Sequence, residues 1–214
     1  MMHTLSHGRR SLAVGSLALF AALGLVAGSA QAATTAVTYD AQASALGQTG
    51  TFTVNAQVAA SAPSTVAADA ALAITLSVGS ITVPTSASGY TVSSIQGIAL
   101  EVPVPADSTY VSASLAGGSG YGSGTPSVSE ASGVVTIAIP GPISAGTTFT
   151  LPTLTLNLTS GASGGTITST LSGSSYTSPG LTFTAVLSVF GLAVDASAVG
   201  YPSPDPTLTS TTIS

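Results

Sequence analysis

Residues 100–115 read LEVPVPADSTYVSASL, and this stretch decides the fold class. Apolar residues occupy every second position from Leu100 to Val104, and the alternation resumes after the Pro/Asp turn at residues 105–108. Side chains of a β-strand point to opposite faces of the sheet with a period of two, so the pattern is typical of strands joined by a tight turn. The stretch predicts a β-meander.

The same alternation recurs on both sides of this stretch, with Gly, Pro and Ser between the apolar runs. Clear examples are residues 51–58, 72–78, 134–139, 148–158 and 181–187. We count nine or ten strands, spaced at roughly 8–15 residues, and no amphipathic helix after residue 32. Short, regularly spaced strands of this kind predict a sandwich of two sheets.

The composition of the chain is compatible with one large hydrophobic core. Of the 214 residues, 44% are hydrophobic and only 4% are charged, and the mean hydropathy is +0.59. Such a chain is too apolar for the kind of disorder that depends on low hydrophobicity and high charge. No linker separates two sets of strands, so we expect one domain.

The basic residues are confined to the beginning of the chain. Arg9 and Arg10 are the two basic residues, and no Lys, Arg, His, Cys, Met or Trp follows residue 10. Phosphate neutralisation needs Lys or Arg, which excludes nucleic acid as a partner. A Ser-His-Asp triad, a Cys nucleophile, a Schiff base and the usual His/Cys metal sites are excluded for the same compositional reason.

Residues 1–32 have the three parts of a secretory signal peptide. A basic start precedes an apolar run at residues 11–28, and Ala30 and Ala32 supply the small residues of an A-x-A cleavage site. An N-terminal membrane anchor and a twin-arginine signal are the alternatives, but the run is short for a span of ~20 residues. Cleavage after Ala32 would leave seven acidic residues, no basic residue and a formal charge of −7. We therefore expect a secreted, extracellular or cell-surface-associated protein, without a membrane span after cleavage.

The middle of the chain resembles the immunoglobulin-like repeat units of bacterial surface and S-layer-associated proteins. The residues that carry the resemblance are 104–113, 133–137, 143–151 and 165–170. The resemblance implies a single immunoglobulin-like antiparallel β-sandwich of about nine strands, preceded by a signal-peptide helix. The sandwich would occupy residues 33–200, and residues 201–214 would form a Pro/Thr-rich tail or a last strand.

Taken whole, the chain is similar to small secreted actinobacterial proteins of unknown function. Members of that group often carry a cysteine near each end of the domain. Ala41 and Gly200 stand near those places here, so this chain cannot form the disulfide. The ends of the domain would then be joined by strand pairing.

Catalysis would have to rely on seven carboxylates. Glu101 and Asp107 are the closest pair in a structured region, which leaves a carboxylate-based glycan-active enzyme as a remote alternative. Strand alternation explains Glu101 better, and turn chemistry explains Asp107 better. Asp195 and Asp205 flank a Pro-rich segment that would offer only a loose calcium site. We therefore predict no catalytic residue, no metal and no cofactor.

Two tyrosines are the predicted ligand-binding residues. Tyr121 lies in the Gly/Ser loop at residues 117–124, and Tyr201 begins the Pro-rich tail. Thr-x-Thr pairs on the strands suggest either a hydroxyl array for ice or carbohydrate, or ordinary solvent-facing threonines.

The function that the sequence favours is a secreted or cell-surface structural or adhesive module without catalytic activity. Strand edges that lack lysine lack a common protection against edge-to-edge pairing, so we expect self-association. The alternative is a binding module for an envelope glycan or another surface ligand.

Overall fold

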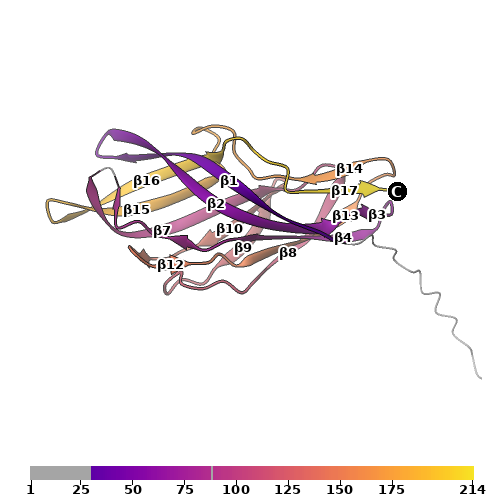
Figure 1. The fold of residues 1–214 in the computed structure, drawn as a ribbon, viewed down its shortest axis with the longest axis horizontal. Coiled ribbons are helices and arrows are strands. Elements are labelled where there is room, and N and C mark those ends of the chain that lie inside the picture. The colour runs from indigo at the N-terminus through magenta and orange to yellow at the C-terminus, as the bar shows by residue number, and fades with distance from the viewer. Residues whose placement is uncertain (1–29, 88) are drawn as a thin grey trace, which may run out of the picture.

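The structure is a computed structural model that describes residues 30–87 and 89–214. Within these residues, ten strands form one continuous antiparallel sheet (Figure 1). Their order in the sheet is β8 (Ser108–Ala116), β13 (Thr153–Ser160), β4 (Ala71–Val78), β2 (Gln48–Pro63), β1 (Ala30–Ala45), β16 (Leu192–Pro202), β15 (Leu181–Val189), β7 (Tyr90–Pro103), β10 (Val134–Ile139) and β9 (Ser127–Ala131).

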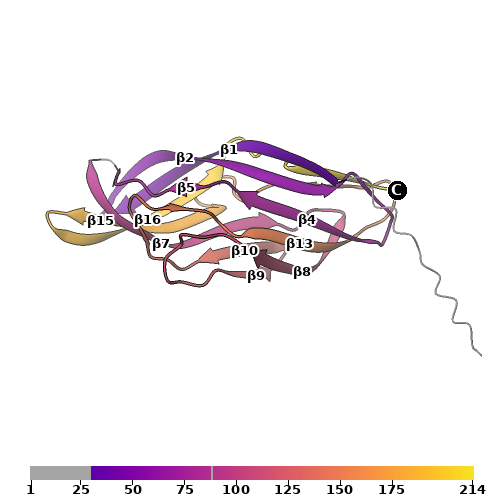
Figure 2. The same cartoon turned by 60° about the horizontal axis from the view of Figure 1, so that its bottom comes forward.

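The sheet curls until its two edge strands approach each other. Some Cα atoms of β8 lie within 8 Å of those of β9, although no hydrogen-bonded ladder joins the two strands among the described residues. The result is a nearly closed, barrel-like sheet in an elongated molecule, as the views in Figures 1 and 2 show.

The predicted class, all-β, is confirmed, but the predicted nine-strand immunoglobulin-like sandwich is wrong. A sandwich consists of two sheets packed face to face, whereas each strand here is hydrogen-bonded to the next in a single sheet. The physical reason is strand length. β1 and β2 each have 16 residues and β7 has 14, so one strand can follow the curve and pair with several others. Much of β1 and β2 is Ala, Ser and Thr, in which apolar alternation is hard to see.

Short strands add to the main sheet or cover its ends. β6 (Ser86–Ala87) and β11 (Ile143–Ser144) pair with β7. β5 (Ile81–Thr82) pairs with β12 (Thr148–Phe149). β14 (Thr166–Ser169), β17 (Thr209–Ile213) and β3 (Thr65–Val66) form a small sheet close to the C-terminus.

The hydrophobic core lies inside the curled sheet. Alternate residues of each long strand face inward, as in β10, where Val135, Ile137 and Ile139 are buried and their neighbours are half-buried. Ile167 and Ile213 extend the same buried cluster into the small sheet at the C-terminal end. In residues 30–87 and 89–214 this is one cluster, which makes the described chain one folded unit.

The predicted signal peptide lies almost wholly in residues 1–29, outside the described residues. Ala30 and Ala32 of the predicted cleavage site are the first and third residues of β1, where they are exposed and pair with Pro63 and Ser61 of β2. No helix in the described part of the chain is long and apolar enough to cross a membrane.

Candidate functional site

Two hairpin turns and the start of β7 lie toward the end of the molecule opposite the C-terminus (Figure 1). The turns join β1 to β2 and β15 to β16. Strand pairing places the start of β7 beside the β15–β16 turn, because Ser188 of β15 lies opposite Thr91 of β7. Ser197 of β16 lies opposite Ser44 of β1, so the β15–β16 hairpin projects several residues beyond the β1–β2 turn. We call residues 43–54, 89–91 and 187–194 the hairpin end.

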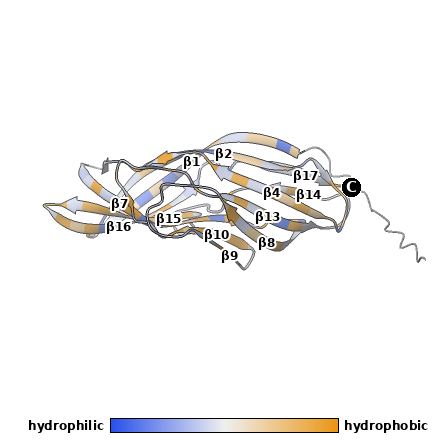
Figure 3. Ribbon diagram, turned by 90° about the horizontal axis from the view of Figure 1, so that it is seen from below, coloured by the Kyte–Doolittle hydropathy of each residue, from blue (hydrophilic) through white to orange (hydrophobic). Residues whose placement is uncertain are grey.

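The hairpin end carries most of the exposed large apolar side chains in the described residues. Leu46 is 76% exposed, Phe190 is 102% exposed and Leu192 is 71% exposed. Tyr90 and Phe52 are 47% and 38% exposed, and Val111 on β8 is the sixth side chain of this kind in the described chain. The ribbon coloured by hydropathy shows apolar segments that continue along β15 and β16 toward their turn (Figure 3).

Two of these residues also occupy strained backbone positions. Leu46 and Gly47 have φ values of 50° and 75°, and Phe190 and Gly191 have φ values of 50° and 81°. A two-residue turn with both φ values positive favours Asn, Asp or Gly at its first position. The β9–β10 turn follows that preference more closely, with the small polar Ser132 in this place. A large apolar residue there is costly, and at Phe190 no packing offsets the cost.

The inner face of the projecting strands is apolar except for Gln48, which lies at the tip of β2 opposite Ala45. Phe52 lies opposite the buried Ala41 and therefore faces inward, where its ring meets that of Phe183 edge to face at 6.4 Å. Thr51 and Thr53 lie on the outer face, one residue away on either side. The hairpin end contains no charged residue, and Asp40 and Asp195 are the nearest acids along β1 and β16. The inner face of the hairpin end is therefore mainly apolar and uncharged, and its outer face carries hydroxyl groups.

The two tyrosines predicted to bind a ligand lie away from this end, in different surroundings. Tyr121 is half-buried against the core, and its hydroxyl donates a hydrogen bond to the Gly117 carbonyl at 3.3 Å. Tyr201 lies opposite Asp40 and packs edge to face on Tyr176, with ring centroids 5.2 Å apart. Both side chains have clear packing roles, and ligand binding by either stays a prediction.

Three of the seven carboxylates accept hydrogen bonds from backbone N–H groups, at separate places. Asp107 sits in the β7–β8 turn and accepts a hydrogen bond from the Thr166 N–H at 3.4 Å. Asp205 accepts one from the Leu171 N–H at 3.2 Å, and Glu130 accepts one from the Gly133 N–H at 2.7 Å. Within the described residues, no three His, Cys, Asp or Glu side chains gather into a group that would hold a metal ion.

Tyr39 is a buried polar group inside the barrel. Its side chain is 4% exposed, and its hydroxyl has no hydrogen-bond partner. Burial raises the pKa of Tyr39 well above its ordinary value, and the nearby Asp205 raises this pKa further. The phenol therefore stays neutral and cannot act as a base near neutral pH.

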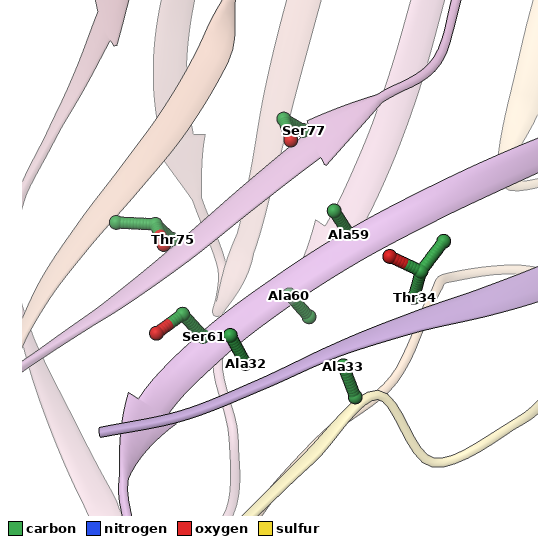
Figure 4. Close-up of a pocket in the computed structure, with 8 residues that line it drawn as sticks. All are labelled: Ala32, Ala33, Thr34, Ala59, Ala60, Ser61, Thr75 and Ser77. Carbon is green, nitrogen blue, oxygen red and sulfur yellow. The ribbon is translucent and has the colours of Figure 1, made fainter. Parts of the chain in front are cut away.

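The surface hollow drawn in Figure 4 is too small for a typical small-molecule site. Its volume is about 180 Å³, and small side chains of β1, β2 and β4 line it. These are Ala32, Ala33, Thr34, Ala59, Ala60, Ser61, Thr75 and Ser77. Ligand pockets usually enclose about 300–1,000 Å³. Cleavage after Ala32 would also remove part of its wall.

Sequence reasoning missed the hairpin end. The signal was present, since Leu46-Gly47 and Phe190-Gly191 each place an X-Gly pair between two alternating runs. The strong hairpin pairs are Asn-Gly and Asp-Gly, and a large apolar X conceals the turn. The apolar run at residues 189–194 therefore resembles a continuation of the preceding strand, although it contains the β15–β16 turn.

Comparison with known proteins finds no protein-family model, no curated protein and no solved structure that matches this chain. A function for the chain has to be argued from its own residues.

Proposed function

We propose that this chain is a non-catalytic structural or adhesive module of the cell exterior, which associates with further copies of itself through its hairpin end. The observation that carries the proposal is the pair Leu46 and Phe190. Each is a large, exposed apolar side chain in a left-handed turn position that favours small polar residues.

Burial of the Leu46 and Phe190 side chains in an interface can offset the backbone strain at these two residues. A non-glycine residue in the left-handed region costs about 1–2 kcal/mol, and an exposed side chain recovers none of this within the monomer. Burying a Leu or Phe side chain against a partner contributes about 1.5–3 kcal/mol. Association can therefore offset the strain that folding leaves in place.

Low charge at the hairpin end is compatible with another copy of the chain as the partner. No acidic residue lies within the hairpin end, and the nearest one is the exposed Asp195, which the β1–β16 register places beside the β1–β2 turn. Export is supported by the signal-peptide pattern of residues 1–32, which would place the module outside the cell.

The test replaces Leu46 and Phe190 by Asn, the residue that the turns favour. We expect Leu46→Asn/Phe190→Asn to unfold at a higher urea concentration than the wild type, since the strain is relieved. We also expect it to remain monomeric at concentrations at which sedimentation velocity shows the wild type to associate. Val111→Asn is the matched control, because Val111 is 59% exposed but lies on β8, outside the hairpin end.

Two results would overturn the proposal. One is a wild-type protein that sediments as a monomer at every concentration. The other is a double variant that associates as strongly as the wild type and the Val111 control.

A further inference from the structure

The outer edge of β2 is free over its first nine residues. β2 pairs with β1 along its whole length, but it pairs with β4 only from Val58 to Ser61. In the part of the chain that the structure describes, no strand pairs with the other side of Gln48–Ala56. Figure 2 shows β4 ending part-way along β2 while the β1–β2 hairpin continues.

The backbone groups at this edge can be identified from one hydrogen bond. The Gly79 N–H donates to the Gln57 carbonyl at 2.8 Å, so the N–H and C=O of Gln57 point toward the β4 side. In an antiparallel strand these groups alternate sides from one residue to the next. The residues whose N–H and C=O point to the free edge are therefore Thr49, Thr51, Thr53 and Asn55.

The edge strands β8 and β9, at the two ends of the strand order, are protected, and the free part of β2 is not. At the edge strand β8, Val111 is the extra residue of a bulge opposite Asn157 and Leu158 of β13. In the edge strand β9, Glu130 lies opposite the fully buried Val135 and so places a charge on the inner face. Bulges and inward-pointing charges are established protections against edge-to-edge pairing. Gln48–Ala56 has no charge, no proline and no shift of register against β1.

We propose that two copies of this chain join by antiparallel pairing of their β2 edges, with a two-fold axis at Phe52. This inference rests on the proposed function, since it requires self-association, and it adds a contact apart from Phe190, because β1 and β16 lie between the free edge of β2 and the β15–β16 turn. Phe52 is the central residue of the free segment. The register about it pairs Thr51 with Thr53 of the second copy, and Thr49 with Asn55 of the second copy.

This register uses every free backbone group of the edge. The four residues that face outward form hydrogen-bonded pairs with their counterparts, for about eight inter-chain hydrogen bonds. A register centred one residue away loses one of these pairs. Because the axis passes through one strand and its own copy, the interface is self-complementary, as a closed dimer requires.

The side chains are compatible with the same register. The two Phe52 rings would meet at a non-hydrogen-bonded position, where cross-strand side chains lie closest, and such aromatic pairs stabilise sheets. Gly50 would lie opposite Val54 of the second copy and leaves room for it. Thr51 and Thr53 would form a hydroxyl row on the outer face.

The first test is a cross-link at the axis. The chain has no cysteine, so Phe52→Cys introduces a single thiol. Opposed positions of a non-hydrogen-bonded pair bring Cβ atoms near the separation of a disulfide. We expect mild oxidation to convert Phe52→Cys largely into a covalent dimer on a non-reducing gel. Val111→Cys is the matched control, and we expect it to stay monomeric under the same conditions.

The second test blocks the edge and leaves the monomer intact. The N–H of Thr51 faces the free edge, so Thr51→Pro removes no hydrogen bond to β1 and is tolerated as at other edge strands. We expect it to raise the dimer dissociation constant at least about tenfold. In the wild type, we expect amide exchange of Thr49, Thr51, Thr53 and Asn55 to slow as the protein concentration rises.

The two tests distinguish pairing of the β2 edges from self-association in general. Association that persists in Thr51→Pro, with no cross-link in Phe52→Cys, would overturn this pairing and leave self-association standing. A cross-link in Phe52→Cys but not in Val111→Cys would support pairing of the β2 edges. If Leu46→Asn/Phe190→Asn also associated as strongly as the wild type, the turn residues would have no role in association. A strictly monomeric wild type without a cross-link would overturn both.

Discussion

A nearby backbone carbonyl leaves no room for a side chain at Gly122. Its φ is 74°, and a Cβ atom at this position would lie 2.1 Å from the Pro142 oxygen. Gly133 provides a comparison, because its φ is 79° but a Cβ atom there would meet open space. The loop around Tyr121 therefore packs on the β10–β11 connection so closely that only glycine fits.

We expect Gly122→Ala to destabilise the protein by about 3 kcal/mol or more, since it combines a left-handed alanine with overpacking. Gly133→Ala should cost about 1 kcal/mol, because it has the backbone strain without the clash. Urea unfolding of the two variants measures the difference. Equal losses would show that the loop moves aside to admit a side chain.

The hydroxyl of Tyr39 is buried in the core without a hydrogen-bond partner among the described residues. A buried polar group without a hydrogen-bond partner costs about 1–3 kcal/mol, whereas the ring itself packs in the core. We therefore expect Tyr39→Phe to raise the free energy of unfolding by about 1 kcal/mol near neutral pH. A loss of stability would show that the hydroxyl has a partner, such as a buried water.

The same residue predicts how stability depends on alkaline pH. Burial raises the pKa of Tyr39 in the folded protein, so above about pH 10 the unfolded chain loses this proton while the folded chain keeps it. The unfolded state then binds fewer protons, and the free energy of unfolding falls as pH rises, by up to about 1.4 kcal/mol per pH unit. Below about pH 10 Tyr39 is protonated in both states, so the full stability is present and does not depend on its titration.

Denaturant unfolding between pH 8 and pH 11 compares the wild type with Tyr39→Phe. The five other tyrosines are common to both proteins, so their titration cancels in the difference. A difference that stays constant across the whole range would contradict the raised pKa.

At the scale of elements, β1 and β16 join the two ends of the domain. Ala41 lies opposite Gly200 in their ladder, and a Cβ atom on Gly200 would lie 3.5 Å from the Ala41 Cβ. This separation is within the range found in disulfides.

We expect Ala41→Cys/Gly200→Cys to form a disulfide on oxidation. The closed loop is long, so the bond should stabilise the protein by about 2–4 kcal/mol and raise its Tm by about 5–10 °C. The reduced form of the same variant is the control in a thermal melt. Thiols that remain free after oxidation, or equal Tm values in both forms, would contradict this geometry.

Strands with strong alternation could be predicted from sequence, and weakly apolar ones could not. Val134–Ile139 was predicted with the bounds that β10 has, because Val and Ile dominate it. β1 runs from Ala30 to Ala45, but only residues 36–39 have a recognisable strand pattern in the sequence. Alanine and threonine differ little in hydrophobicity, so a strand built from them shows no clear apolar and polar face. The full length of β1 depends on its pairing with β2 and β16, which the local sequence pattern does not reveal.

For the whole molecule, residue spacing predicted the class and missed the architecture. Short strands at regular intervals suit a sandwich and a curled single sheet equally well. The difference lies in which strands become neighbours, such as β2 beside β4 and β13 beside β8. The candidate site was lost for the same reason, since Leu46 and Phe190 are 144 positions apart in the sequence and share an end only after folding.

The ladder between β1 and β16 also orders events during synthesis. β1 has one neighbour close behind it in β2, but its other neighbour follows only after residue 191. Contacts between such distant segments form slowly, because closing a long loop is entropically costly. The pairing that joins the two halves of the sheet is therefore completed only after almost the whole polypeptide has left the ribosome.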